Sequence, residues 1–256
     1  MMEVPITKLE FTKELVRDTG RLIQSLMSQN LNIDTKQNAH DFVTNVDKQA
    51  EEFMVATIQA MYPDQGFITE EKMIDNEVKH DMWIIDPIDG TTNFIFQKRN
   101  FAISVGYYEE GQPKFGIVYD VVGDEMYVGI TGEGAYLNEQ KLEPLDPNVA
   151  LKDAIVNADN RMFKTFKVDL DEHIMVQRYL GSAALEIIAV AAGRTNSYMS
   201  RRLKPWDIAA AVIVLKEVGG TWYFGDYHDA IAYDDKHEVF ISGSNATILE
   251  SLIALR

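Results

Sequence analysis

The nine residues from Asp86 to Phe94, DPIDGTTNF, combine residue types that can carry out phosphate chemistry. Two carboxylates follow the apolar run Met82 to Ile85, at the point where a buried strand ends in a turn. Paired carboxylates bind hard divalent cations, which prefer oxygen ligands. A Gly-Thr-Thr turn that opens a helix presents free backbone N–H groups to an anion. A metal site beside a phosphate site predicts phosphoryl chemistry.

Two further acids stand where an element begins or ends. Glu70 follows the short apolar run Gly66 to Thr69, and Asp207 opens a late helix in the segment PWDIAA. Ligand sites in α/β proteins commonly lie at such positions. Clustered carboxylates repel one another unless a cation neutralises them, which predicts Mg²⁺, with Mn²⁺ as a substitute. Taken singly, Glu70 and Glu71 also fit a solvated pair, and Asp207 fits a residue that stabilises the helix dipole.

The composition is that of a globular protein with an acidic surface. The 256 residues are 46% apolar and 25% charged, and they are numerous enough to bury a substantial core. The 24 basic and 40 acidic residues give a formal charge of −16, which argues against nucleic acid as a partner. The same charge fits a protein that concentrates divalent cations, although a solvated acidic surface accounts for most of the excess.

The sequence has no cysteine, which excludes disulfides, thiolate zinc sites and a cysteine nucleophile. The first residues, MMEVPITKLE, lack the pattern of a signal peptide. Apolar runs such as Ile208 to Leu215 are far shorter than the roughly 20 residues of a membrane span. We therefore expect a cytoplasmic protein with no membrane partner.

Hydrophobic periodicity predicts helices alternating with strands. Helices are expected at about residues 8–28, 46–61, 183–192, 206–218 and 245–255. The second of these should bury Phe53 and Met61 on its apolar face. Strands are expected at residues 66–69, 82–85, 102–108, 114–121 and 125–129, the last three as an antiparallel meander. Residues 29–40 are polar and without periodicity, which predicts a mobile loop. The pattern indicates a mixed α/β protein with helices covering sheets.

Several strings in this sequence are typical of one protein family. They are TEE at Thr69 to Glu71, WIIDPIDGTTNF at Trp83 to Phe94 and PWDIAAAVIVLKEVGG at Pro205 to Gly220, with weaker matches DFVTNVD at Asp41 to Asp47 and GSAAL at Gly181 to Leu185. Over nearly its whole length the chain resembles the inositol monophosphatase family of metal-dependent, lithium-sensitive sugar phosphatases. The resemblance implies a layered αβαβα sandwich with an antiparallel sheet and a second mixed sheet. It also implies a single domain over residues 1–256, with two intimately packed halves that meet near residues 145–155.

The resemblance assigns metal ligands to individual positions. Glu70, Asp86 and the backbone carbonyl of Ile88 would hold a first Mg²⁺. Asp86 would bridge to a second Mg²⁺, which Asp89 and Asp207 complete. A third, weaker ion would depend on Glu70 and water.

The resemblance also assigns the reaction. The phosphate would lie on the backbone N–H groups of Gly90 and Thr91. Thr91, paired with Asp47, would help Glu70 and the first metal to activate a water. Two cations would offset the repulsion between the acids and a phosphate dianion, as in other two-metal in-line displacements. The family is usually dimeric, so we expect a homodimer.

Substrate identity is less determined by the sequence. Family substrates contact the positions of Asp89, Asp207 and the backbone of Ala183, and inositol monophosphate is the first candidate. Animal-type inositol phosphatases carry an acid shortly before the Trp-Asp pair, whereas this chain has none between Tyr198 and Lys204.

Three cations stand in that stretch instead. Arg201, Arg202 or Lys204 would contact a second anionic group on the substrate, since arginine suits phosphate. This hypothesis adds NADP(H) and fructose 1,6-bisphosphate as alternative or dual substrates; a basic surface segment is the plain alternative. Two other classes remain, a 3′-phosphoadenosine 5′-phosphate phosphatase and a non-catalytic binding protein.

Overall fold

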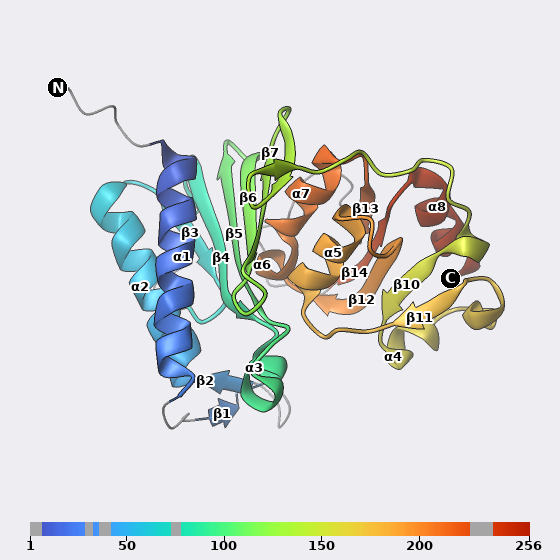
Figure 1. The fold of residues 1–256 in the computed structure, drawn as a ribbon, viewed down its shortest axis with the longest axis horizontal. Helices are drawn as coiled ribbons and strands as arrows, with labels where there is room; N and C mark the ends of the chain where they lie inside the picture. The colour runs from blue at the N-terminus through green and yellow to red at the C-terminus, as the bar shows by residue number, and fades with distance from the viewer. Residues whose placement is uncertain (1–6, 29–32, 36–41, 73–77, 226–237) are drawn as a thin grey trace.

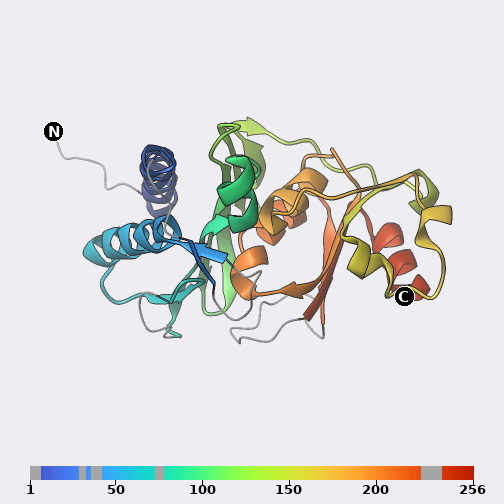
Figure 2. The same ribbon diagram turned by 90° about the horizontal axis from the view of Figure 1, so that it is seen from below.

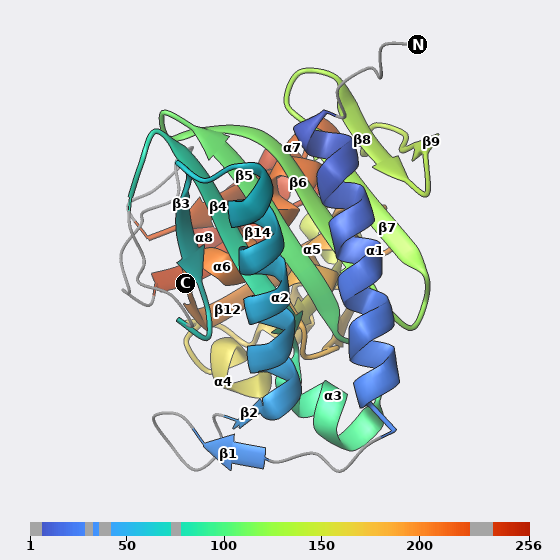
Figure 3. The same cartoon turned by 90° about the vertical axis from the view of Figure 1, so that its left-hand side faces the viewer.

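Two long amphipathic helices form the outer layer on one side of the molecule. The computed structural model describes residues 7–28, 33–35, 42–72, 78–225 and 238–256 (Figure 1). Helix α1 (Lys8–Leu26) begins after Thr7, whose side chain accepts a hydrogen bond from the Glu10 N–H. Helix α2 (Asn45–Met61) begins after Thr44, which forms a capping box with Asp47. Figure 3 shows both helices lying across one face of the first sheet.

The first sheet has seven strands in the order β3-β4-β5-β6-β7-β8-β9. Their bounds are Gly66–Thr69, Asp81–Asp89, Ala102–Glu109, Gln112–Asp120, Glu125–Ile130, Gly134–Leu137 and Gln140–Lys141. Strand β3 runs parallel to β4, and the other neighbours are antiparallel. Both faces of β4 are covered: Trp83 and Ile85 pack toward α1 and α2, whereas Met82 and Ile84 pack toward the middle helices. Burial on both faces explains the unbroken apolar run.

Three helices fill the middle layer between the two sheets (Figure 2). They are α5 (Ala183–Ala191), α6 (Pro205–Ile208) and α7 (Ala211–Glu217). Helices α6 and α7 lie close to the first sheet because a row of glycines crosses three of its strands. Gly106, Gly116 and Gly129 are direct cross-strand neighbours. A Cβ at Gly116 would lie 2.8 Å from the Ala210 Cα, and one at Gly129 would lie 2.7 Å from the Val214 Cα.

The second sheet has five strands in the order β11-β10-β12-β14-β13 and mixes parallel with antiparallel pairs. Their bounds are Val176–Arg178, Ile155–Ala158, Ser197–Leu203, Glu238–Gly243 and Thr221–Phe224. Helices α4 (Asn160–Phe163) and α8 (Ala246–Leu255) form the fifth layer (Figure 1). Short 3₁₀ turns cover Leu151–Asp153 and Leu170–Glu172. The predicted αβαβα sandwich is confirmed, with β3 as the parallel exception in the first sheet.

The chain passes from the first sheet to the second between Lys141 and Ile155. A boundary between two halves near residues 145–155 stays a prediction. Among the described residues, no helix is long and apolar enough to cross a membrane.

Three local predictions are corrected. The helix expected at 206–218 is two helices, α6 and α7, separated by Ala209 and Ala210, which keep right-handed helical backbone angles and lie against Gly106 and Gly116. Phe53 and Met61 are 37% and 51% exposed, since α2 buries only the stripe that faces the sheet. Within the predicted loop, Ile33–Thr35 forms strand β1, paired with β2 (Phe42–Thr44), while residues 29–32 and 36–40 lie outside the described residues.

Candidate metal centre

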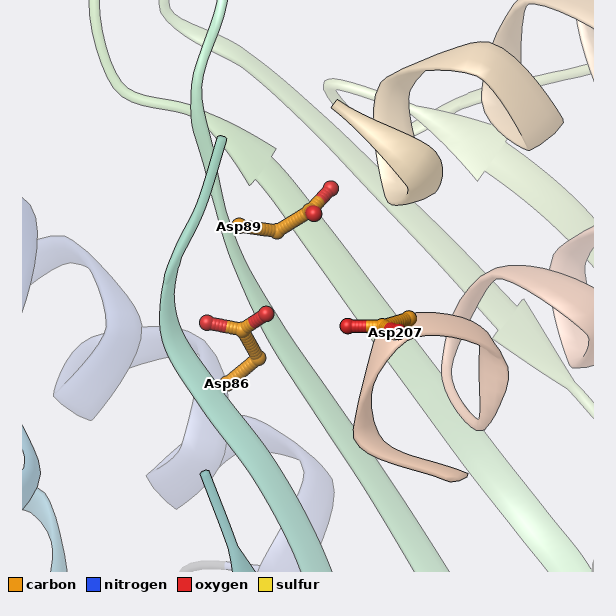
Figure 4. A group of neighbouring side chains, drawn as sticks. All are labelled: Asp86, Asp89 and Asp207. Carbon is orange, nitrogen blue, oxygen red and sulfur yellow. The ribbon is translucent and has the colours of Figure 1, made fainter. Parts of the chain in front are cut away.

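Three aspartates from two distant parts of the sequence lie together between the first sheet and the middle helices. Asp86 and Asp89 come from β4, and Asp207 comes from α6 (Figure 4). One carboxylate oxygen from each lies within 4.8 Å of the other two. Asp86 and Asp89 are 1% and 7% exposed, and Asp207 is half-buried.

A bulge in β4 places Asp86 and Asp89 on the same face of the sheet. Side chains alternate between the two faces of a strand, so Asp86 points toward the middle helices, as Ile84 does. In a regular strand Asp89, three positions later, would point to the opposite face. Asp86 pairs with Ser104 and Asp89 with Ala102, so β4 holds one more residue than β5 in this interval. The extra residue reverses the alternation and turns Asp89 to the side of Asp86. Pro87 lies inside the bulge, where the lack of a backbone N–H breaks no ladder bond.

Asp86 is a buried acid whose pKa is strongly raised. Burial raises its pKa well above the ordinary value, and the negative charges of Glu70, Asp89 and Asp207 raise it further. The Ile88 N–H donates a hydrogen bond of 2.9 Å to Asp86 Oδ1. A buried carboxyl group surrounded by other carboxylates is costly to ionise without a cation, so the cluster favours positive charge.

Asp89 is held at the N-terminus of α5. It accepts hydrogen bonds from the Ser182 hydroxyl at 2.6 Å, the Ala184 N–H at 2.6 Å and the Ala183 N–H at 3.2 Å. Burial raises the pKa of Asp89 to about 6, although the bonds from Ser182 and Ala184 act in the opposite direction. The Ala183 N–H therefore donates to Asp89, and contact between the Ala183 backbone and substrate hydroxyls stays a prediction.

Asp207 has a second contact at the start of its own helix. The Lys204 N–H donates a hydrogen bond of 2.6 Å to Asp207 Oδ2. Asp207 therefore has two roles. It caps the start of α6, in line with the alternative that it stabilises this helix end, and it also belongs to the aspartate group.

Glu70 lies at the edge of the same group. It follows β3, and its N–H donates to the Ile85 carbonyl on β4 at 3.3 Å. Its carboxyl group is hydrogen-bonded to Asp86, which contributes to the raised pKa of Asp86. Its charge also raises the pKa of Asp89 and Asp47, although burial is the main cause in both.

Thr91 and Asp47 form the predicted side-chain pair beside Ile88. The Thr91 hydroxyl lies 3.2 Å from Asp47 Oδ1 and 3.2 Å from the Ile88 carbonyl, so it donates to either oxygen. Asp47 is buried, and its Oδ2 accepts from the Thr44 N–H and hydroxyl. Burial raises the pKa of Asp47, and the bonds from Thr44 partly offset this.

Gly90 links β4 to α3 (Thr91–Gln97) and has a φ of +99°. A Cβ at this position would lie 3.1 Å from the Asn100 carbonyl oxygen and 3.1 Å from the Ser182 Cβ. Both the backbone angle and the space therefore require glycine.

The cationic segment before Asp207 is only partly described. Arg201 is exposed on β12, where a bulge lies between Ser200 and Leu203. The side chain of Arg202 lies outside the described part of the structure. The Lys204 Nζ lies 5.9 Å from the centre of the Trp206 ring. Contacts of Arg201 and Arg202 with a substrate stay predictions.

Two buried side chains near the acids were missed by sequence reasoning. Ser182 supports Asp89 and also caps α5, and a serine before an apolar helix is a recognisable N-cap signal. Glu51 lies four residues after Asp47 on α2 and accepts hydrogen bonds from the segment that carries Glu70. Its spacing from Asp47 places both acids on one helix face, which could have indicated it.

Known proteins resemble this chain in sequence. A sequence model of the inositol monophosphatase family matches residues 7–237. Inositol-1-monophosphatase of Bacillus subtilis (strain 168) is 43% identical over 221 residues, which cover 83% of each chain.

Solved structures resemble it in fold. The structure of SaIMPase-II bound to inositol monophosphate superposes with a TM-score of 0.81 at 33% identity, covering 95% of this chain and 91% of the other. The structure of an IMPase/NADP phosphatase complexed with Mg²⁺ and phosphate gives a TM-score of 0.86 at 28% identity, covering 96% and 93%. The match over nearly all described elements shows that the chain belongs to the inositol monophosphatase family.

Proposed function

We propose that this chain is a Mg²⁺-dependent phosphomonoesterase that hydrolyses inositol monophosphate to inositol and phosphate. The observation that carries the proposal is the convergence of Asp86, Asp89 and Asp207 at a buried site, with Glu70 hydrogen-bonded to Asp86. Family membership supports the reaction class. The substrate is supported by the Bacillus subtilis relative, an inositol-1-monophosphatase, and by the inositol monophosphate bound in SaIMPase-II.

The donor atoms of the site suit Mg²⁺, and Mn²⁺ as a substitute, because all are oxygens. Glu70, Asp86 and the Ile88 carbonyl would hold one ion, and Asp86, Asp89 and Asp207 a second, with a third at Glu70. The raised pKa of Asp86 supports this assignment, since a cation would compensate both the burial of the charge and the repulsion from neighbouring acids, which together raise it. A structural relative at 28% identity was solved with Mg²⁺ and phosphate.

Bound divalent cations lower the pKa of a water and stabilise the leaving oxygen. The residues around them would orient that water. The Thr91 hydroxyl donates a hydrogen bond to Asp47 or to the Ile88 carbonyl. The hydroxyl oxygen of Thr91 is then free to accept a hydrogen bond from the water. Glu70 would accept the other water proton. The N–H groups of Gly90 and Thr91 would bind phosphate oxygens while the water oxygen forms a bond to phosphorus and the bond between phosphorus and the inositol oxygen breaks. The departing inositol oxygen would take up a proton from solvent, which balances the proton accepted by Glu70.

A second candidate function is the removal of a phosphate from NADP(H) or fructose 1,6-bisphosphate. The structural relative with Mg²⁺ is named as a dual IMPase/NADP phosphatase. Arg201 is exposed on β12, the strand that leads into α6 and Asp207, so it could meet a second anionic group. Arg201 and Arg202 would then select bisphosphates, while Asp89, Asp207 and the Ala183 backbone contact sugar hydroxyls.

A substrate panel tests the function. Phosphate release is measured from inositol monophosphate, NADP, fructose 1,6-bisphosphate and 3′-phosphoadenosine 5′-phosphate, with and without Mg²⁺ and with added Li⁺. We expect release that requires Mg²⁺, is inhibited by Li⁺, is fastest with inositol monophosphate and falls by about 100- to 1,000-fold in Asp86→Asn. Asp153→Asn, an exposed acid, is the matched control. Folded protein that releases no phosphate from any substrate would instead be a binding protein.

We also propose a homodimer, on the family resemblance alone. Light scattering should give twice the chain mass of 29.0 kDa. A mass of one chain at working concentration would contradict this.

A further inference from the structure

Glu51 is a fully buried carboxylate outside the group of proposed metal ligands. It lies on α2 and is 0% exposed. A buried acid is costly unless hydrogen bonds compensate it, so its contacts indicate why the fold keeps it there.

Both oxygens of Glu51 accept hydrogen bonds from residues next to Glu70. The Thr69 hydroxyl donates to Oε1 at 2.8 Å, and the Glu71 N–H donates to Oε2 at 2.7 Å. Thr69 precedes Glu70 and Glu71 follows it, so one carboxylate binds the side chain before Glu70 and the backbone after it.

The same segment is also joined to β4. The Glu70 N–H donates to the Ile85 carbonyl, and Ile85 directly precedes Asp86. The backbone of Glu70 is thus fixed to α2 through Glu51 and to β4 next to the bridging aspartate.

Helix α2 carries a second contact of this kind. Asp47 lies four residues before Glu51, one helical turn away on the same face. Asp47 accepts from the Thr91 hydroxyl at 3.2 Å. One rigid helix therefore contacts both Thr91 and the segment of Glu70, the two groups that would orient the attacking water.

We propose that Glu51 is a positioning residue, which fixes the Glu70 carboxylate relative to Asp86 and Thr91. The proposal rests on the proposed function, in which Glu70 binds metal and water. Without Glu51, the Thr69 hydroxyl and the Glu71 N–H lose their buried acceptor, and the turn at Glu70 moves to find another. Displacing a reacting group by 1 Å can lower a rate by about 100-fold.

The test compares Glu51→Ala with Glu51→Gln. Glutamine keeps one oxygen to accept from the Glu71 N–H and places an NH₂ group beside the Thr69 hydroxyl oxygen, which can accept. We expect Glu51→Ala to lower kcat by about 10- to 100-fold with little change in KM, and Glu51→Gln to restore kcat to within about 3-fold of wild type. Glu52→Ala, the exposed neighbour, is the matched control and should leave kcat unchanged.

Calorimetric titration of the metal-free proteins with Mg²⁺ gives a readout that needs no substrate. We expect the affinity for Mg²⁺ to fall about 10-fold in Glu51→Ala and to stay unchanged in Glu52→Ala. Loss of a residue that orients a metal ligand typically lowers metal affinity by about 10- to 100-fold. Thermal melting of each variant reports whether it is folded. If Glu51→Ala does not fold, Thr69→Val removes one of the two hydrogen bonds with little change in shape, and should lower both kcat and Mg²⁺ affinity about 3- to 10-fold.

The outcomes separate the two proposals. A folded Glu51→Ala or Thr69→Val with wild-type kcat and Mg²⁺ affinity would make Glu51 a purely structural residue. An equal loss in Glu51→Gln and Glu51→Ala would also overturn the positioning role. A wild-type protein without Mg²⁺-dependent phosphatase activity would instead refute the proposed function, and the Mg²⁺ titration would still test Glu51.

Discussion

At the scale of single residues, the acidic group is an arrangement that is unfavourable by itself. Asp86 is buried beside Glu70, Asp89 and Asp207, and burial and these charges together raise its pKa. Hydrogen bonds to Asp89 oppose the effect of burial there, yet its pKa still reaches about 6. Repulsion between buried like charges is typical of a functional site. It makes the folded protein less stable than one with neutral side chains at these positions.

Replacing Asp86 with asparagine should have opposite effects on stability and activity. The new amide side chain can still accept from the Ile88 N–H and can donate to Glu70, so the repulsion disappears. We expect the metal-free protein to gain about 1 to 3 kcal/mol in unfolding free energy. Activity should fall by about 100- to 1,000-fold, as when a main electrostatic group is lost. Urea unfolding in a chelator and a phosphate-release assay measure the two effects; a destabilised metal-free variant would contradict the account.

At the scale of elements, the site depends on two irregular features. The bulge at Pro87 and Ile88 turns Asp89 to the side of Asp86, and the first turn of α5 supplies three hydrogen bonds to Asp89. Ser182 donates a hydrogen bond to Asp89 and also caps the N-terminus of α5, since its oxygen accepts from the Leu185 N–H at 3.4 Å.

Ser182→Ala should therefore weaken Mg²⁺ binding in a pH-dependent way. Loss of the hydroxyl removes a contact that lowers the pKa of Asp89, so this pKa should rise above about 6. Protons compete with the metal below that pKa, so the loss of Mg²⁺ affinity should be larger at pH 6 than at pH 8. The lost cap should also cost about 1 kcal/mol of stability.

Calorimetric titration of Ser182→Ala at both pH values checks this, with Ser251→Ala as control, since Ser251 is half-buried on α8 and its hydroxyl donates to the Thr247 carbonyl of the same helix. An equal loss of affinity at pH 6 and pH 8 would contradict the role assigned to Ser182.

At the scale of the whole molecule, the glycine row sets the distance between the first sheet and the middle helices. Gly106, Gly116 and Gly129 let the backbone of α6 and α7 approach the sheet, and α6 carries Asp207 toward β4. The packing of two layers thus determines whether Asp207 reaches Asp86 and Asp89.

Gly116→Ala should test this coupling between packing and metal binding. The added methyl group would lie 2.8 Å from the Ala210 Cα, so the layers must separate. Overpacking of this kind costs about 1 to 3 kcal/mol in unfolding free energy. We expect the Mg²⁺ affinity of the folded variant to fall as well. In Gly132→Ala nothing lies within 4 Å of the new Cβ, so this control carries only the strain of its positive φ. Destabilisation without any change in Mg²⁺ affinity would contradict the coupling.

The sequence was sufficient to predict the layered architecture and the acids that lie together in the site, because both depend on strong local signals. The apolar run before Asp86 predicted a buried strand, and the alternation of helices and strands predicted the layered architecture. Family strings then pointed to Glu70, Asp86, Asp89 and Asp207, of which the structure brings the three aspartates into one group with Glu70 beside Asp86.

Features that depend on distant contacts were not predictable. The break between α6 and α7 has no glycine or proline to mark it, and lies where Ala210 packs against Gly116 of another layer. Phe53 looked apolar enough for the core, but the width of the buried stripe on α2 is set by the sheet beneath it. Glu51 was missed because a buried acid is recognisable only when its partners Thr69 and Glu71 are known.

The most direct measurement is anomalous diffraction from crystals grown with Mn²⁺. The account predicts strong peaks among the oxygens of Asp86, Asp89 and Asp207, with another between Glu70 and Asp86. Crystals in which Mn²⁺ binds elsewhere, with no peak among these four acids, would contradict it.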